Sequence, residues 1–161
     1  MSSKNIPVVR FEFSETVNTV QELDHIGLSD AEIVELANYR NTLGYWRADL
    51  ATGHVFWSEN VFRLYGMEYT KGPVNLTIAN EAIHPEDLNC IFELVERAAS
   101  EKSGFRCILR LKDGQNDFKY TLSCGRYRVT DDGREELYGM TEEILDRARL
   151  INIVSDPSLA D

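Results

Sequence analysis

The sequence GYWRADLATGHVFWS occupies residues 44–58. Aromatic and β-branched residues, which favour strands, stand on both sides of Ala51-Thr52-Gly53. Glycine adopts positive φ at no steric cost, so the last residue of this triplet suits the turn of a hairpin. The stretch therefore predicts two strands, over residues 44–50 and 54–58. Its two tryptophans leave open whether the hairpin forms an aromatic core or the mouth of a ligand pocket.

A helix is predicted ahead of the hairpin. Ser29-Asp30-Ala31-Glu32 has the pattern of a capping box, in which the serine hydroxyl and the glutamate carboxylate bond the first backbone N–H groups. The apolar stripe that follows ends at Gly44, the expected end of this helix. The stripe consists of Ile33, Leu36, Ala37 and Leu43. A weaker helical pattern, Val17, Val20 and Leu23, follows a candidate strand or extended arm at residues 7–13.

Helices are also predicted after the hairpin. Ser58 is a suitable N-cap for a short helix that ends at Gly66, and a helical turn is expected over residues 76–83. Pro85 suits the first position of a longer helix, and apolar residues then recur at steps of three and four. The longest helix is therefore predicted over residues 86–102.

Two Asp-Gly pairs divide the last third of the chain. Asp-Gly between β-rich segments is a strong hairpin signal, and the pairs stand at residues 113–114 and 132–133. They separate three predicted strands, at residues 104–112, 117–129 and 134–143. A modest helix from residue 144 and an acidic tail follow.

These elements indicate an α+β protein with a five-stranded antiparallel sheet and helices on one face. The predicted organisation is an N-terminal helical leader (1–42), one domain (43–146) and a C-terminal connector helix with a tail (147–161). The 161 residues suffice for one domain with a core. No apolar stretch approaches the roughly 20 residues that span a bilayer, and the N-terminus lacks the features of a signal peptide.

Charge and cysteine content exclude several classes of function. The formal net charge of −10 disfavours binding to nucleic acid or to an anionic membrane surface. The cysteines at positions 90, 107 and 124 form no CxxC pair and have no histidine at zinc-binding spacing. We expect reduced thiols in a cytoplasmic protein without a metal site.

Four motifs in order resemble the PAS domain family of bacterial sensor proteins, over about residues 43–149. The hairpin has that family's Gly-x-Trp, Asp, Thr-Gly and Trp-Ser, and IHPEDL (83–88) resembles the segment before its long helix. LRLKDG (109–114) and LYGMTEEILDR (137–147) resemble the strands that follow. The sequence departs from the family at Glu143 and Leu145, where the family has Asp and Thr.

The resemblance implies a PAS fold with a cavity between the sheet and the long helix. It implies a sensory or interaction module that binds a small ligand and dimerises, and that is not an enzyme. The candidate ligand-binding residues are Trp46, Ala48, Phe56, Ile91, Val95, Cys107, Leu109, Thr121 and Ser123.

The strand over residues 117–129 allows two orientations. Phe118, Tyr120, Leu122 and Cys124 form an apolar set that could face the core. The resemblance instead turns Thr121 and Ser123 toward the cavity and leaves Tyr120 and Leu122 on the back face. We favour the second orientation, because a few polar groups on apolar walls are typical of small-ligand sites.

Cofactors are not expected. Haem would need an axial ligand in the cavity wall, and the long helix has no histidine. His84 precedes that helix and suits a capping role. The flavin-binding, light-sensing branch of the family carries a reactive Cys with Arg and Gln neighbours ahead of the long helix. Cys90 lies within the helix and lacks those neighbours.

The expected partners are a second copy of the chain, a small ligand and a downstream signalling domain or protein. The homodimer would use the leader helix and the back face of the sheet, with Tyr120, Leu122 and, as a further candidate, Tyr127. Two alternatives remain open. One is a ligand-free dimerisation or protein-interaction module. The other, more distant, is a small α+β enzyme with a cone-like cavity, which would need an Asp–His pair inside the pocket.

Overall fold

The computed structural model describes residues 11–14, 21–39 and 43–144. The strands are β1 (Phe11–Ser14), β2 (Gly44–Asp49), β3 (Val55–Trp57), β4 (Gly104–Lys112), β5 (Phe118–Val129) and β6 (Glu135–Glu143). The helices are the 3-10 helix η1 (Asp24–Ile26) and the α-helices α1 (Asp30–Asn38), α2 (Glu59–Leu64), α3 (Leu76–Ala82) and α4 (Pro85–Glu101).

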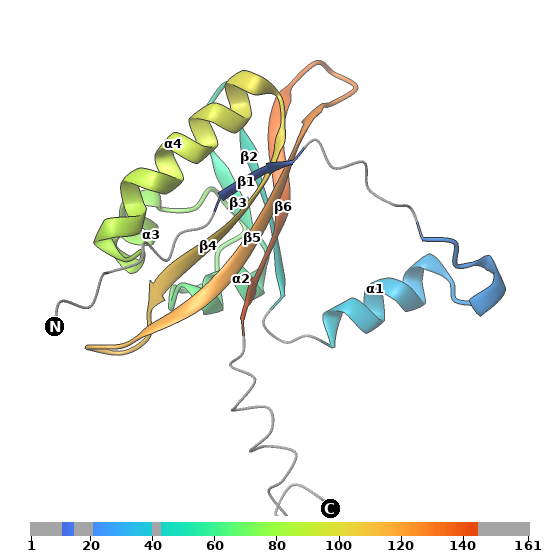
Figure 1. Ribbon diagram of the computed structural model, residues 1–161, viewed down its shortest axis with the longest axis horizontal. Coiled ribbons are helices and arrows are strands. Elements are labelled where there is room, and N and C mark those ends of the chain that lie inside the picture. Colours follow the sequence, from blue (N-terminus) through green and yellow to red (C-terminus); the bar gives the residue numbers. More distant parts are fainter. Residues whose placement is uncertain (1–10, 15–20, 40–42, 145–161) are drawn as a thin grey trace, which may run out of the picture.

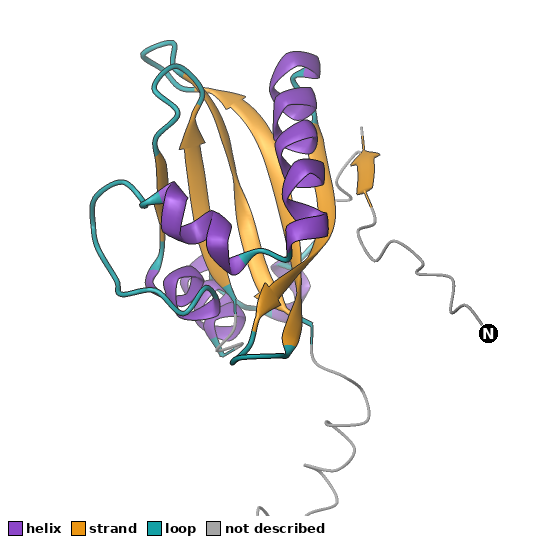
Figure 2. Cartoon of the chain, turned by 90° about the vertical axis from the view of Figure 1, so that its left-hand side faces the viewer, coloured by secondary structure: helices purple, strands orange, loops and turns teal. Residues whose placement is uncertain are grey.

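The strands form one antiparallel sheet in the order β1-β4-β5-β6-β2-β3. Helices α2, α3 and α4 lie on one face of this sheet, and α4 runs roughly in the direction of β4 and β5 (Figures 1 and 2). The five predicted strands and the α+β class are confirmed. The leader adds a sixth strand, because β1 pairs with the start of β4 at the edge of the sheet.

The C-terminal meander follows the prediction closely. Its three strands begin and end within one residue of the predicted limits. Gly114 and Gly133 have φ angles of 79° and 83°, so both Asp-Gly turns use the conformation that glycine adopts freely. The sequence signal was strong here because turn chemistry and strand patterning agreed.

The second orientation of β5 is confirmed. Thr121 and Ser123 are buried on the face that α4 covers, whereas Tyr120 is exposed on the opposite face. Hereafter the face covered by α4 is the inner face and the opposite one is the outer face. Tyr127 was a candidate for the outer face, and that prediction is wrong. It shares the inner face with Thr121 and Ser123 because strand side chains alternate, and it packs against the core.

The N-terminus of α4 is fixed at the edge of β4. His84 caps the helix, since its Nδ1 accepts a hydrogen bond from the backbone N–H of Glu86 at 3.1 Å. Asp87 accepts hydrogen bonds from the backbone N–H of Arg110 at 3.0 Å and from its guanidinium at 2.6 and 3.0 Å. The expected capping role of His84 is confirmed, and the Asp87 carboxylate holds α4 to the sheet.

The leader helix ends earlier than predicted. Ser29 caps α1 by accepting from the N–H of Glu32 at 3.2 Å, as expected. The helix ends at Asn38, and Gly44 is the first residue of β2 rather than a helix terminus. A Cβ on Gly44 would lie 2.5 Å from Cγ2 of Val61, so close packing against α2 explains this glycine. No residue of α1 is buried.

Three predictions cannot be compared with the structure. The weak helical pattern at Val17 and Val20, the exit helix beyond residue 144 and the departure at Leu145 lie outside the described residues.

Candidate functional site

A cavity of about 470 Å³ lies between the inner face of the sheet and helices α2, α3 and α4. Its floor is formed by strands β2, β4, β5 and β6, and the apolar side of α4 closes it from above. Apolar side chains dominate the wall.

One row of residues across the sheet explains the shape of the floor. The register places Phe105, Gly125, Gly139, Trp46 and Trp57 side by side, on β4, β5, β6, β2 and β3. The ring of Phe105 fills the position that a side chain at residue 125 would need, since a Cβ there would lie 2.3 Å from its Cε1. Phe105 and Trp46 are stacked with their ring centroids 5.9 Å apart. The two glycines therefore leave room on the floor for the neighbouring aromatic rings.

Polar groups on the floor are few and close together. The hydroxyls of Ser123 and Thr141 are 2.7 Å apart, and both residues line the cavity. Thr121, two residues before Ser123 in β5, donates instead to the carbonyl of Leu109 at 3.2 Å. A hydroxyl pair with one shared proton retains a second proton, so it can donate one hydrogen bond to a ligand.

Tyr65 brings a further hydroxyl from the end of α2. Its ring lies 4.4 Å from that of Trp57, and the residue lines the cavity. Burial, with a smaller contribution from the Cys107 thiol, raises the pKa of Tyr65 far above its usual value, so the hydroxyl stays protonated. The hydroxyl has no hydrogen-bond partner among the described residues.

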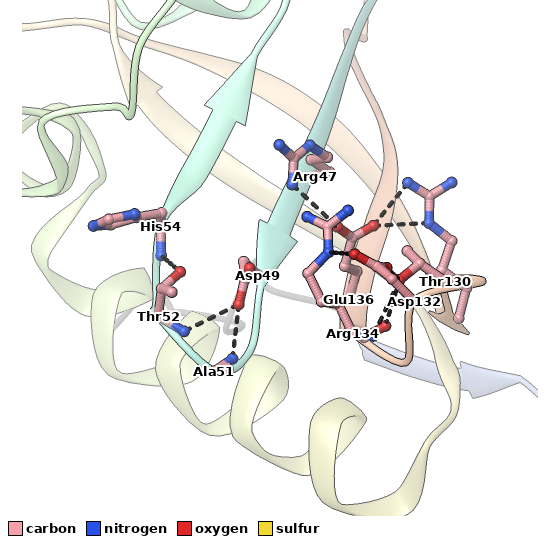
Figure 3. Close-up of polar contacts among 10 residues, drawn as sticks. Arg47, Asp49, Ala51, Thr52, His54, Thr130, Asp132, Arg134 and Glu136 are labelled. Atoms are coloured by element: carbon pink, nitrogen blue, oxygen red, sulfur yellow. Dashed lines mark hydrogen bonds and ion pairs between the residues drawn. The ribbon is translucent and has the colours of Figure 1, made fainter.

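The cavity opens between the β2–β3 turn, α3 and α4. Its exposed lining residues are Gly53, Leu76, Phe92 and Glu96. Asp49 fixes the turn at this mouth by accepting from the N–H groups of Ala51 at 2.9 Å and Thr52 at 3.0 Å (Figure 3). These backbone hydrogen bonds hold the pKa of Asp49 below its usual value, so the carboxylate is ionised at neutral pH.

The arginines of the central strands lie on the outer face. Glu136 is buried there beneath guanidinium groups, at 3.1 Å from Arg47, 2.8 Å from Arg128 and 3.7 Å from Arg134 (Figure 3). Arg47 also lies over the ring of Phe56, 4.3 Å from its centroid. Positive charge is thus concentrated on the side of the sheet away from the cavity.

Most of the predicted ligand-binding residues line the cavity. They are Trp46, Ala48, Ile91, Val95, Leu109 and Ser123. Cys107 and Thr121 are buried on the inner face without lining the cavity. Burial raises the pKa of the Cys107 thiol to about 12, so it stays protonated. Ligand binding by these residues remains a prediction.

Phe56 does not lie where it was predicted. It pairs with Arg47 and shares the outer face with it, while its neighbours Val55 and Trp57 line the cavity. The turn between the strands sets this register, and three consecutive apolar residues in β3 give no alternation from which to infer it.

Residues from α2 and α3 were missing from the predicted site. Tyr65, Ala79 and Asn80 line the cavity, although the sequence analysis did not single them out. A helical pattern indicates which side of a helix is apolar, but it does not indicate whether that side meets a filled core or an open space. Within the described ranges, no group of three or more His, Cys, Asp or Glu residues could hold a metal ion.

No helix among the described residues is both long and apolar enough to cross a membrane.

Comparisons with known proteins identify the architecture. No protein-family model matches the sequence, and no curated protein matches it significantly. Solved structures do match. One is the N-terminal domain of a diguanylate cyclase with PAS/PAC sensor from Marinobacter aquaeolei, with a TM-score of 0.53 and 14% identity over 63% of this chain and 94% of that one.

Two further structures are similar. A sensory box histidine kinase/response regulator from Burkholderia thailandensis matches with a TM-score of 0.55 and 18% identity, covering 75% of this chain and 91% of that one. A domain of a putative light and redox sensing histidine kinase from Haloarcula marismortui matches with a TM-score of 0.55 and 16% identity, over 72% of this chain and all of that domain. The chain therefore has the fold of a PAS domain.

Proposed function

We propose that this chain is the sensory module of a signal-transduction protein and that it binds a small ligand in the cavity beneath α4. The single observation that carries this proposal is the open, mostly apolar cavity with a few polar groups on its wall. Its volume of about 470 Å³ falls within the range of small-molecule sites. The similar solved structures belong to a diguanylate cyclase and to histidine kinases, which supports a role as an input domain.

Native mass spectrometry of the purified chain tests ligand binding. We expect a retained small molecule or, if it dissociates, a rise in melting temperature with members of a chemically diverse fragment panel. Ala48 lines the cavity and Ala51 lies in the exposed turn, so Ala48→Phe should abolish binding and Ala51→Phe should preserve it. If neither a retained mass nor a fragment distinguishes the two variants, the ligand-free interaction module is the better description.

The same preparation tests the cofactor prediction. We expect no absorption band at wavelengths longer than that of the aromatic residues. A haem or flavin band at stoichiometric occupancy would contradict this prediction and would place a coloured cofactor in the cavity.

Dimerisation is the second proposed property. Helix α1 exposes apolar side chains, including Val34, Leu36 and Tyr39, and none of its residues is buried. Residues 21–39 contain five acidic residues and no Lys or Arg. The outer face of the sheet carries exposed tyrosines together with Arg47, Arg126 and Arg128. We infer that α1 packs on the outer face of a second copy, where the charges are complementary.

An enzymatic role is less well supported. The cone-type enzyme requires an Asp–His pair within the cavity. Asp49 lines the mouth, but no histidine is among the described residues that line the cavity. The downstream partner is proposed to be a signalling domain or a separate signalling protein.

A further inference from the structure

We propose that the cavity selects a flat, neutral aromatic molecule bearing one hydroxyl-type group, and that it rejects carboxylates. This inference rests on the proposed ligand binding and specifies the chemical class of the ligand. Three independent features of the cavity support it: the charges on its wall, the arrangement of its rings and the position of its hydroxyl groups.

The charges on the wall are all negative. Asp49 and Glu96 lie at the mouth, and no Lys, Arg or His is among the described lining residues. The nearby arginines of β2 and β5 lie on the outer face, where Glu136 pairs with Arg47 and Arg128. A carboxylate ligand would have to leave water, pass the acidic side chains of Asp49 and Glu96 and remain without a cation among the described lining residues. Burial of an unpaired charge is strongly unfavourable, so anionic ligands are excluded.

The aromatic rings favour a flat ligand. Trp46 and Phe105 form one stacked pair, and Trp57 and Tyr65 form another pair with ring centroids 4.4 Å apart. Trp46 and Trp57 are cross-strand neighbours, so the two pairs are adjacent, with Tyr65 contributed by the end of α2. Aromatic rings prefer offset stacked and edge-to-face contacts, and a planar ligand against these two pairs makes both kinds.

The hydroxyl groups specify one polar substituent. The Ser123–Thr141 pair has one proton to donate, and the Tyr65 hydroxyl lacks a partner among the described residues. A ligand hydroxyl can accept from one of these groups and donate to another. A purely apolar ligand would leave the second proton of the Ser123–Thr141 pair and the Tyr65 hydroxyl without a ligand partner, which lowers its affinity relative to that of a phenol. The site therefore distinguishes a phenol-like ligand from its hydrocarbon.

Calorimetric titration of the full chain with three naphthalene derivatives tests the charge preference. The probes share one bicyclic ring and carry a hydroxyl, a carboxylate or an aminomethyl group. We expect naphthol to bind at least about 10-fold more tightly than naphthoate, which corresponds to roughly 1.4 kcal/mol. Equal or tighter binding of naphthoate, or of the naphthylmethyl ammonium ion, would overturn the inference and leave cavity binding intact. If no probe binds, this ligand class is wrong, whereas the retained-mass test of the proposed function is unaffected.

Single substitutions test the roles of the hydroxyl groups and of the acidic residue at the cavity mouth. Tyr65→Phe and Ser123→Ala should each weaken naphthol binding about 2- to 10-fold, whereas neither should weaken binding of unsubstituted naphthalene, because removal of the hydroxyl relieves the penalty of leaving it unpaired. Tyr120→Phe, on the outer face, is the matched control and should have no effect. Glu96→Lys should improve naphthoate binding, while Glu93→Lys, an exposed α4 position that does not line the cavity, should not. The same response at residues 93 and 96 would show a general charge effect and would contradict the acidic mouth as the cause.

Discussion

Gly139 shows how a single side chain would prevent the central strands from approaching each other. A Cβ at this position would lie 1.8 Å from the carbonyl oxygen of Cys124, which belongs to the neighbouring strand. A backbone atom cannot rotate away as a side chain can. At Gly125, in contrast, the added Cβ would meet the ring of Phe105, which could move into the cavity.

Substitution of Gly139 by alanine tests this close approach. We expect Gly139→Ala to lower the free energy of unfolding by about 3 kcal/mol, because β5 and β6 must separate locally. Gly72→Ala is the matched control, since a Cβ there meets nothing within 4 Å, and it should change stability by less than about 0.5 kcal/mol. Urea unfolding at neutral pH measures both. Similar stabilities of the two variants would contradict the clash.

Asp49 makes the stability of the β2–β3 turn depend on pH. Backbone hydrogen bonds lower the pKa of this carboxyl below 3.8 in the folded state, so on acidification the unfolded chain takes up the proton first. The contribution of Asp49 to stability is therefore present above that value and is lost as pH falls through the folded-state pKa. We expect the difference in unfolding free energy between wild type and Asp49→Asn to be constant above about pH 5 and to narrow as pH falls below that value. Urea titrations at several pH values measure this difference, and a constant difference would contradict the assignment.

The sequence predicted which strand residues are buried better than it predicted the face of the sheet to which their side chains point. Along most of β4 apolar residues alternate with charged ones, as in Phe105-Arg106-Cys107 and Leu109-Arg110-Leu111, so the inward direction of Phe105 and Leu109 follows from the sequence. The three residues of β3 are all apolar, so the same argument could not separate Phe56 from Trp57. The register set by the turn, with Arg47 beside Phe56, decided their directions.

At the scale of elements, α4 is attached to β4 by a buried ion pair. Asp87 is 1% exposed and the side chain of Arg110 is 14% exposed, while Glu86, which also contacts Arg110 at 3.1 Å, is 62% exposed. Removing one partner of a buried pair leaves an uncompensated charge. The two acidic neighbours therefore differ in importance, although both contact the same guanidinium.

Paired substitutions at the start of α4 test this difference. We expect Asp87→Asn to lower the unfolding free energy by about 3 kcal/mol, because Arg110 remains largely buried without its charged partner. Glu86→Gln should cost less than about 0.5 kcal/mol, as is usual for exposed pairs. Chemical denaturation measures both variants. A larger loss at Glu86 than at Asp87 would show that the exposed contact anchors the helix.

Element boundaries were predictable where two local signals coincided. The limits of α4 followed from the proline at its start and its apolar periodicity, and the meander followed from its Asp-Gly turns. The end of α1 was predicted wrongly, because Gly44 was interpreted from local chemistry alone. Its actual cause is tertiary, since Val61 of α2 leaves no room for a Cβ. A glycine in the sequence can mark a helix end, a turn or a close contact between elements, and only the tertiary packing shows which of these applies.

At the scale of the whole molecule, the order of motifs was enough to predict the PAS fold, while the composition of the cavity wall was not. Tyr65 and Asn80 enter the wall because α2 and α3 fold over the row from Phe105 to Trp57. That arrangement depends on contacts between segments distant in sequence. The residues that line the cavity can therefore be identified only when the positions of the helices on the sheet are known.

The exposed leader helix leads to a prediction about assembly. An amphipathic helix without buried residues is expected to pack against an apolar surface. The outer face of the sheet is such a surface, and its arginines are opposite in charge to the acidic residues of the leader. We expect light scattering to give twice the chain mass, with dissociation favoured at high salt because the charges are screened. Leu36→Asp on α1 and Tyr120→Asp on the outer face should each give monomers. Ile78→Asp on α3 is the matched control, since Ile78 is 49% exposed and Leu36 is 53% exposed. A monomeric wild type at high micromolar concentration would rule out the dimer, and dissociation by Ile78→Asp alone would place the interface on the helical face instead.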